Sequence, residues 1–157
     1  MRKKTRKDYE RDFQKYLVSN KKIKLKTGRS LTVLGSEVIL YKPMHVLTEG
    51  DLRFENLNAR NCIGRIDLII QYGGKKYVTE IKYTPFTVEN FWAGIKCIAY
   101  SAYYNWQIEL FGKGLYYPAL MLPHKAIKLE HKIIAGKLKI QLFGIEKTEE
   151  GWKVEEI

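Results

Sequence analysis

The chain has 157 residues, 45% of them hydrophobic, and carries a formal net charge of +11 at neutral pH with an isoelectric point near 9.6. This length predicts a single domain over residues 1–157, and the composition argues against wholesale disorder. The positive charge indicates a polyanionic partner, with nucleic acid favoured over an anionic membrane surface.

Several protein classes are excluded by what the sequence lacks. Its two cysteines, Cys62 and Cys97, are far apart and in no Cys-x-x-Cys pattern, which argues against a zinc ribbon or a four-cysteine iron–sulfur cluster. No apolar run approaches the ~20 residues of a membrane span, and no stretch of signal-peptide length is present. We therefore expect no membrane partner and a cytoplasmic location, or the host cytoplasm if the source is viral rather than archaeal.

A basic arm over residues 1–7 precedes the first expected helix. It would either contact DNA phosphates or serve as a solubilising tail. Apolar residues then recur at helical spacing from Tyr9 to Leu17, and Asn20-Lys21-Lys22 ends the helix. The basic residues of the arm that we assign to DNA binding are Lys3, Lys4 and Arg6.

Residues 31–46 follow a strand-like pattern, with a turn expected at Gly35-Ser36. Residues 48–62 are polar and irregular. They are followed by residues 64–82, which contain the most informative pattern of the chain.

Residues 64–82 read as two strands joined by a turn at Gly73-Gly74. A Gly-Gly pair can supply the positive φ values that a two-residue hairpin turn requires. With that turn, Tyr72 pairs with Lys75, and the register continues until Asp67 faces Glu80.

The predicted register places two carboxylates side by side. Directly opposed residues of an antiparallel pair have Cβ atoms about 4.5–5.5 Å apart, so Asp67 and Glu80 should repel unless a cation lies between them. Strand alternation puts Lys82 on the same face as Glu80. We expect the hairpin to have this charged face and an opposite apolar face that packs on a helix.

The second half of the chain predicts a helix from the N-cap Thr87 to about Gln107, followed by a strand at 115–122. Pro118 predicts an edge position or a bulge for that strand. Residues 125–134 are ambiguous between helix and strand, 138–142 alternate as a strand, and a hairpin is expected around Glu149-Glu150-Gly151. This order predicts an α/β sandwich with a mixed central sheet.

The chain resembles the PD-(D/E)xK superfamily of nucleases, which is also called restriction-endonuclease-like. Asp67 and Glu80-Ile81-Lys82 match its signature, and "GRIDLII…YVTEIKY" is similar to archaeal Holliday-junction resolvases. Two departures are that Ile66 stands where the family has proline and that Gly94 replaces a helix glutamine. The resemblance implies a three-layer sandwich, with a central mixed sheet flanked by helices.

The resemblance also implies a metal site. Asp67, Glu80 and the backbone carbonyl of Ile81 would hold Mg²⁺ or Mn²⁺, which favour oxygen ligands. A further ligand is expected from Glu10 in the first helix, with Glu55 as the alternative. Lys82 would orient or deprotonate the metal-activated water, or neutralise the reacting phosphate.

The implied activity is metal-dependent hydrolysis of DNA, with an endonuclease favoured over an exonuclease and a homodimer implied. Double-stranded or branched DNA is the expected partner. Arg65, Lys96 and Tyr100 are assigned to DNA binding beside the basic arm, although a solvated Lys96 and a buried Tyr100 remain open. The alternatives are an inactive DNA-binding protein of this fold and an RNA-processing nuclease. A second Glu-x-Lys, Glu130-His131-Lys132, lacks an Asp hairpin and is interpreted as surface.

Overall fold

A computed structural model describes residues 2–41, 62–83, 87–109 and 115–157. Glu55 and residues 42–46 therefore lie outside the described residues. The described part forms the helices α1 (Arg6–Asn20), α2 (Thr87–Glu109) and α3 (Leu129–Leu138) and the 3-10 helix η4 (His124–Ala126). The strands are β1 (Lys22–Lys24), β2 (Ser30–Tyr41), β3 (Cys62–Tyr72), β4 (Lys75–Ile81), β5 (Tyr116–Pro123), β6 (Gln141–Thr148) and β7 (Gly151–Glu156).

The seven strands form one mixed sheet in the order in which they occur in the chain, β1 to β7. The neighbours are antiparallel except for β4, β5 and β6, which run parallel. Parallel strands need a crossover, and α2 supplies it between β4 and β5 while η4 and α3 supply it between β5 and β6. The predicted α/β class with a mixed central sheet is confirmed.

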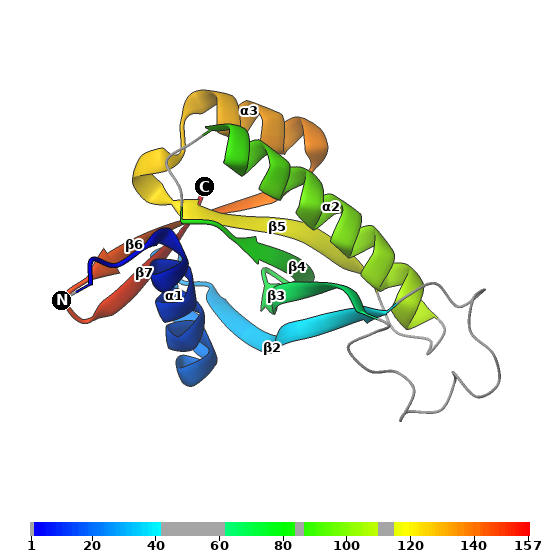
Figure 1. The fold of residues 1–157 in the computed structure, drawn as a ribbon, viewed down its shortest axis with the longest axis horizontal. Helices are drawn as coiled ribbons and strands as arrows, with labels where there is room; N and C mark the ends of the chain where they lie inside the picture. The colour runs from blue at the N-terminus through cyan, green and yellow to red at the C-terminus, as the bar shows by residue number, and fades with distance from the viewer. Residues whose placement is uncertain (1, 42–61, 84–86, 110–114) are drawn as a thin grey trace.

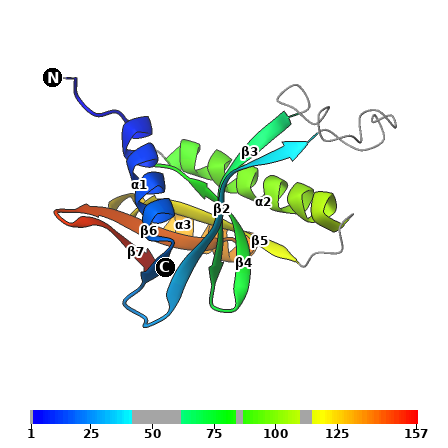
Figure 2. The same ribbon diagram turned by 90° about the horizontal axis from the view of Figure 1, so that it is seen from below.

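Helices cover both faces of this sheet (Figures 1 and 2). Phe13 and Leu17 of α1 are fully buried in the larger core cluster, against one face. Cys97 of α2 and Ala135 of α3 belong to a second cluster, and tyrosines of α2 pack on a third, both on the opposite face. The result is three layers with the sheet in the middle.

The predicted hairpin register is confirmed up to the pair next to Asp67 and Glu80. Pairing runs from Tyr72 with Lys75 to Leu68 with Thr79. The two turn glycines have φ of 58° and 77°, the left-handed region that glycine adopts without steric cost. The turn thus fixes which residues of β3 and β4 oppose each other.

The prediction that one whole face of the hairpin is charged is wrong. Ile69 and Val78 lie on it and are buried beneath tyrosines of α2. A sheet with helices on both sides has no solvated face, so its strands are apolar on both sides. Lys75 and Lys76 are exposed next to the turn, and the acidic pair lies at the opposite end of the hairpin.

Two local predictions near the N-terminus are also corrected. Gly35-Ser36 is not a turn, because β2 continues through it with a register shift between Val33 and Gly35. Such a bulge bends a strand without ending it. The basic arm is shorter than expected, because Thr5 and Asp8 form a capping box that starts α1 at Arg6.

Two predictions for the second half of the chain are wrong. β5 lies between β4 and β6 rather than at an edge. Pro118 is tolerated there because β6 pairs only from Ala119 onward, so Pro118 has a neighbour on one side alone. Leu138 ends α3 instead of starting a strand, whereas the hairpin of β6 and β7 around Glu149-Glu150 is confirmed.

Gly151 offers a test of the packing of α1 against this last hairpin. Its φ is +143°, and a Cβ there would lie 2.5 Å from Cε2 of Tyr16 in α1. Gly151→Ala is expected to lower the free energy of unfolding by about 1–3 kcal/mol, measured by thermal or urea unfolding. Gly136→Ala in α3 is the control, because nothing lies within 4 Å of its added Cβ. Equal stabilities of the two variants would contradict the packing described here.

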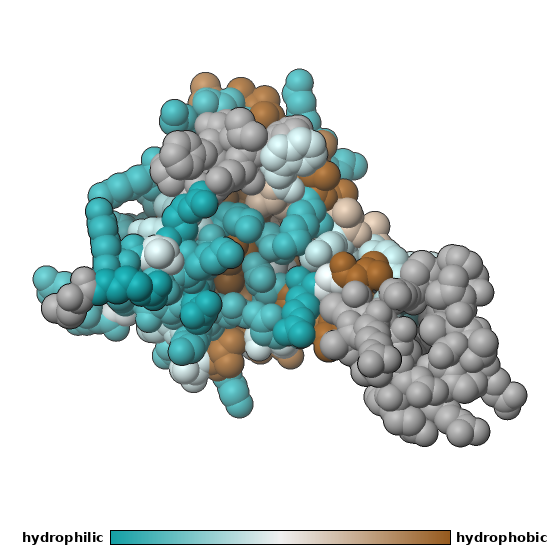
Figure 3. Space-filling model, viewed as in Figure 1, coloured by the Kyte–Doolittle hydropathy of each residue, from teal (hydrophilic) through white to brown (hydrophobic). Residues whose placement is uncertain are grey.

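The surface differs between the helices. Figure 3 shows hydrophilic residues around α1 and apolar residues gathered over α3, where Leu129 and Ile133 are exposed. Among the described residues, no helix is both long enough and apolar enough to cross a membrane.

Candidate active site

The end of the β3–β4 hairpin holds two carboxyl groups, of which Glu80 is buried and Asp67 is half-buried. One residue beyond the last recorded pair, Leu68 with Thr79, the register brings Asp67 opposite Glu80. The Asp67 Oδ2 accepts a hydrogen bond of 2.9 Å from the amide of Ile81, which holds the aspartate across the strand gap. The Glu80 side chain is 2% exposed, and its strand position directs it towards α2.

The protonation of this pair is strongly perturbed. Burial, and then the neighbouring Asp67 carboxylate, raise the pKa of Glu80 to about 7. Burial also raises the pKa of Asp67, and the hydrogen bond from Ile81 opposes this only in part. Two adjacent acids that resist ionisation together are arranged to share a proton or a cation.

Lys96 supplies one cation to this pair. Its Nζ lies 2.8 Å from Oε1 of Glu80 and also sits 5.2 Å from the ring centroid of Tyr100. Burial alone would lower the pKa of Lys96, but the hydrogen bond and charge of Glu80 raise it above its usual value. The lysine that the sequence assigned to DNA is thus an ion-pair partner of Glu80 in this structure.

Lys82 and Glu10 line the same cavity of about 380 Å³ as Lys96. The Lys82 amide donates to the carbonyl of Met121 in β5 (3.0 Å), and Oε1 of Glu10 accepts from the amide of Tyr83 (2.9 Å). These bonds attach α1 and the end of β4 to the parallel strands. The structure therefore brings Glu10, Lys82 and Lys96 to one cavity, and Lys96 connects it to Glu80. Among the described residues, Glu10 forms no three-carboxylate group with Asp67 and Glu80, so its role as a metal ligand stays a prediction.

The remaining predicted DNA-binding residues lie in different places. Tyr100 is half-buried on α2 against the sheet, and it lies so close to Gly64 that an added Cβ there would be 2.3 Å from its hydroxyl. Arg65 is exposed on β3 and lines neither this cavity nor the larger one near Lys4. Lys3 is exposed before α1. The proposed stacking role of Tyr100 is weakened by its packing.

Glu37 is a site residue that the sequence interpretation missed. It lies between Ser36 and Val38, which pair with the residues on either side of Asp67, and its charge raises the pKa of Asp67. The side-chain amide of Gln14 bridges Glu37 Oε1 and the Asp67 carbonyl, both at 2.9 Å. The signal was an acidic residue within a strand-like segment, hidden by the expected turn.

The donor set was compared with the needs of a divalent ion. The part of the chain that the structure describes contains no group of three or more His, Cys, Asp or Glu positioned to hold a metal. Proteins usually bind Mg²⁺ through one or two carboxylates, with waters and substrate phosphate oxygens as the other ligands. Two adjacent carboxyls such as the half-buried Asp67 and the buried Glu80 fit that mode of binding.

Comparisons with family models, curated proteins and solved structures find no match for this chain. The functional argument therefore depends on the geometry of the described residues.

Proposed function

We propose that this protein is a metal-dependent nuclease that hydrolyses DNA phosphodiester bonds, with Asp67, Glu80 and Lys82 at its catalytic centre. The observation that carries the proposal is the interacting pair of carboxyls at the end of the hairpin, the buried Glu80 and the half-buried Asp67, with the charges of Lys96 and Lys82 acting on Glu80. Titratable groups perturbed by burial and by a specific neighbour gather at functional sites. A purely structural role would be served better by apolar residues.

The fold assignment within the proposal is restriction-endonuclease-like. It is supported by the order of elements: a helix, an antiparallel hairpin with Glu-x-Lys on its second strand, and a helical crossover to a parallel strand. The net charge of +11 suits a polyanionic substrate.

Each residue then has a chemical role. Asp67 and Glu80 would hold Mg²⁺, which when bound would supply a polarised water and shield the charge that develops on the phosphate. Lys82 would orient that water, remove its proton or neutralise the reacting phosphate. Lys96 balances the charge of Glu80 in the metal-free protein and would be free to contact a substrate phosphate once a divalent ion takes its place.

An inactive DNA-binding protein of the same fold is the second candidate. The 2.8 Å ion pair of Lys96 with Glu80 favours it, because a lysine already compensates the carboxylate. The lack of a three-residue metal cluster among the described residues points the same way. Isothermal calorimetry with Mg²⁺ and Mn²⁺ separates the two candidates, since a protein that binds neither ion supports the inactive module.

The direct test is a cleavage assay over linear, nicked, branched and single-stranded DNA, with Mg²⁺ and with EDTA. We expect cleavage of at least one DNA substrate in Mg²⁺ and none in EDTA, because two carboxylates without a divalent cation provide no Lewis acid. RNA of the same sequence is assayed in parallel, and cleavage of RNA alone would replace DNA by RNA as the substrate.

A further inference from the structure

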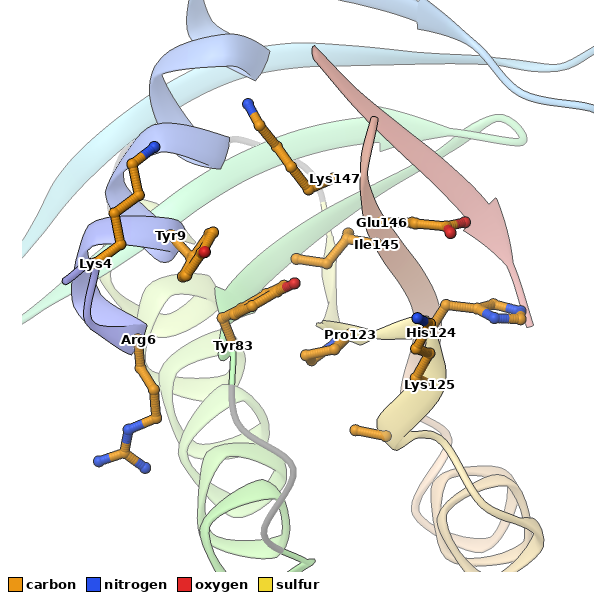
Figure 4. A pocket seen from close by; sticks show the side chains of 11 residues that line it. Lys4, Arg6, Tyr9, Tyr83, Pro123, His124, Lys125, Ile145, Glu146 and Lys147 are labelled. Carbon is orange, nitrogen blue, oxygen red and sulfur yellow. The ribbon is translucent and has the colours of Figure 1, made fainter. Parts of the chain in front are cut away.

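A second cavity, of about 430 Å³, is larger than the active-site cavity and shares Arg6 with it; Figure 4 shows the side chains that line it. It is bordered by the carboxyl ends of the parallel strands β4, β5 and β6, through Tyr83, Pro123 and Ile145. Ligands of open α/β sheets bind outside this edge of the sheet. The volume is in the range of small-molecule sites. We call this cavity the Tyr83 pocket.

The charges around the Tyr83 pocket favour an anion. Its lining contains the basic residues Lys4, Arg6, Lys125 and Lys147 and one carboxylate, Glu146. Lys147 is paired with Asp12 at 3.0 Å, so its charge is compensated in part. Figure 4 shows Lys4 and Arg6 on the α1 side of the pocket and Lys125 on the opposite side.

An aromatic surface lies between these basic groups. Tyr83 stacks on Tyr9 with ring centroids 4.9 Å apart, and its ring also meets the edge of Trp152. Both tyrosines line the pocket and are half-buried, so their rings are held in place. Cations around a fixed aromatic ring match a phosphate with an attached base, because bases stack on aromatic side chains.

The Tyr83 pocket is continuous with the candidate active site. Arg6 lines both cavities, and Lys82 of the active site is followed directly by Tyr83 of the pocket. The amide of Tyr83 is also bonded to Glu10 of the active-site cavity. A DNA strand that runs from the active-site cavity past Arg6 would enter the Tyr83 pocket with a neighbouring nucleotide.

We propose that the Tyr83 pocket binds one nucleotide of the substrate DNA strand beside the phosphate to be cleaved, with its base on Tyr83 and its phosphate near Lys4 and Lys125. This inference rests on the proposed nuclease function and extends it: the substrate is unpaired at this position, since a base within a duplex cannot stack on a protein ring.

The test measures binding of a fluorescent single-stranded DNA oligonucleotide in EDTA by anisotropy, at several salt concentrations. Tyr83→Leu is expected to weaken binding about tenfold, the order of one lost base stack, without changing the salt dependence. Tyr83→Phe keeps the ring and should bind as the unmodified protein does. Lys125→Ala should lower affinity and reduce the slope of log affinity against log salt by about 0.7, one phosphate contact to a single strand.

Lys137→Ala is the matched control, because Lys137 is equally exposed and lines neither cavity. The proposal is overturned if Lys125→Ala and Tyr83→Leu bind the oligonucleotide as Lys137→Ala does. It is also overturned if the pocket binds free dAMP but not the oligonucleotide. If Tyr83→Leu does not fold, the affinity and the salt dependence of Lys125→Ala still test the proposal, because Lys125 is exposed. The binding assay contains EDTA, so it does not depend on cleavage. If the pocket variants lose binding but the unmodified protein never cleaves DNA, the nuclease function is refuted and the pocket is not. Normal binding in the variants of an active nuclease would refute the pocket alone.

Discussion

Glu80→Gln is expected to reduce Mg²⁺-dependent DNA cleavage at least about a thousandfold, while DNA binding in EDTA is retained. Glutamine has nearly the same shape but no negative charge, so the site loses one of its two anionic ligands for the cation. A thousandfold loss corresponds to about 4 kcal/mol of transition-state stabilisation, the order of magnitude expected when a catalytic metal site is disabled. Cleavage is followed on gels under single-turnover conditions.

The control for this variant is present in the same chain. Glu130 starts the other Glu-x-Lys sequence, and it is exposed in the first turn of α3. Glu130→Gln removes the same charge from the protein and should cleave at the unmodified rate. If Glu80→Gln retains cleavage in Mg²⁺, the proposed catalytic centre is wrong, whatever the DNA affinity.

Glu80→Gln is also expected to stabilise the metal-free protein at alkaline pH. Burial and Asp67 raise the pKa of Glu80 to about 7, against an ordinary 4.5 in the unfolded chain. Between these values the folded state binds more protons than the unfolded state, so stability falls as pH rises from about 4.5 to about 7. Glutamine resembles the protonated acid and does not undergo this loss.

The expected difference between Glu80→Gln and the unmodified protein is therefore small at pH 4.5 and about 2 kcal/mol at pH 8, in favour of the variant. Urea unfolding at the two pH values in EDTA measures it, with Glu130→Gln as the control. Added Mg²⁺ should reverse the order at pH 8, because only the unmodified protein gains stability from the bound ion. A variant that is less stable at pH 8 in EDTA would show that the Lys96 ion pair outweighs the repulsion within the acidic pair.

The centre of the site could be predicted from the sequence because its geometry is local. A two-residue glycine turn fixes the register, and Asp67 and Glu80 lie six residues from that turn on either side. Only hydrogen bonds between adjacent strands are needed to bring them together. The helices before and after the hairpin could be predicted for the same reason, since helical spacing depends on neighbours three and four residues apart.

The parts that could not be predicted depend on contacts between distant segments. Glu37 lies level with Asp67 because the bulge between Val33 and Gly35 shifts the register of β2 against β3 by one residue, and a bulge resembles a turn in sequence. The Tyr83 pocket needs residues near positions 4, 83, 125 and 146 to converge at one sheet edge, which no local pattern reports. The position predicted for β5 from Pro118 was wrong because a proline disrupts a sheet only where a neighbouring strand needs its missing N–H, and β6 pairs only from Ala119 onward.

The first helix depends on the last strands, and this has a consequence for how the molecule assembles. Asp12 of α1 accepts a hydrogen bond from the indole of Trp152 and pairs with Lys147. Phe13 packs on the same indole. During synthesis α1 emerges well before β6 and β7, so the contacts of Asp12 and Phe13 with Trp152 form only when the β6–β7 hairpin has left the ribosome. We expect a chain that stops before β6 to hold the β3–β4 hairpin while α1, which carries Glu10, lacks this support.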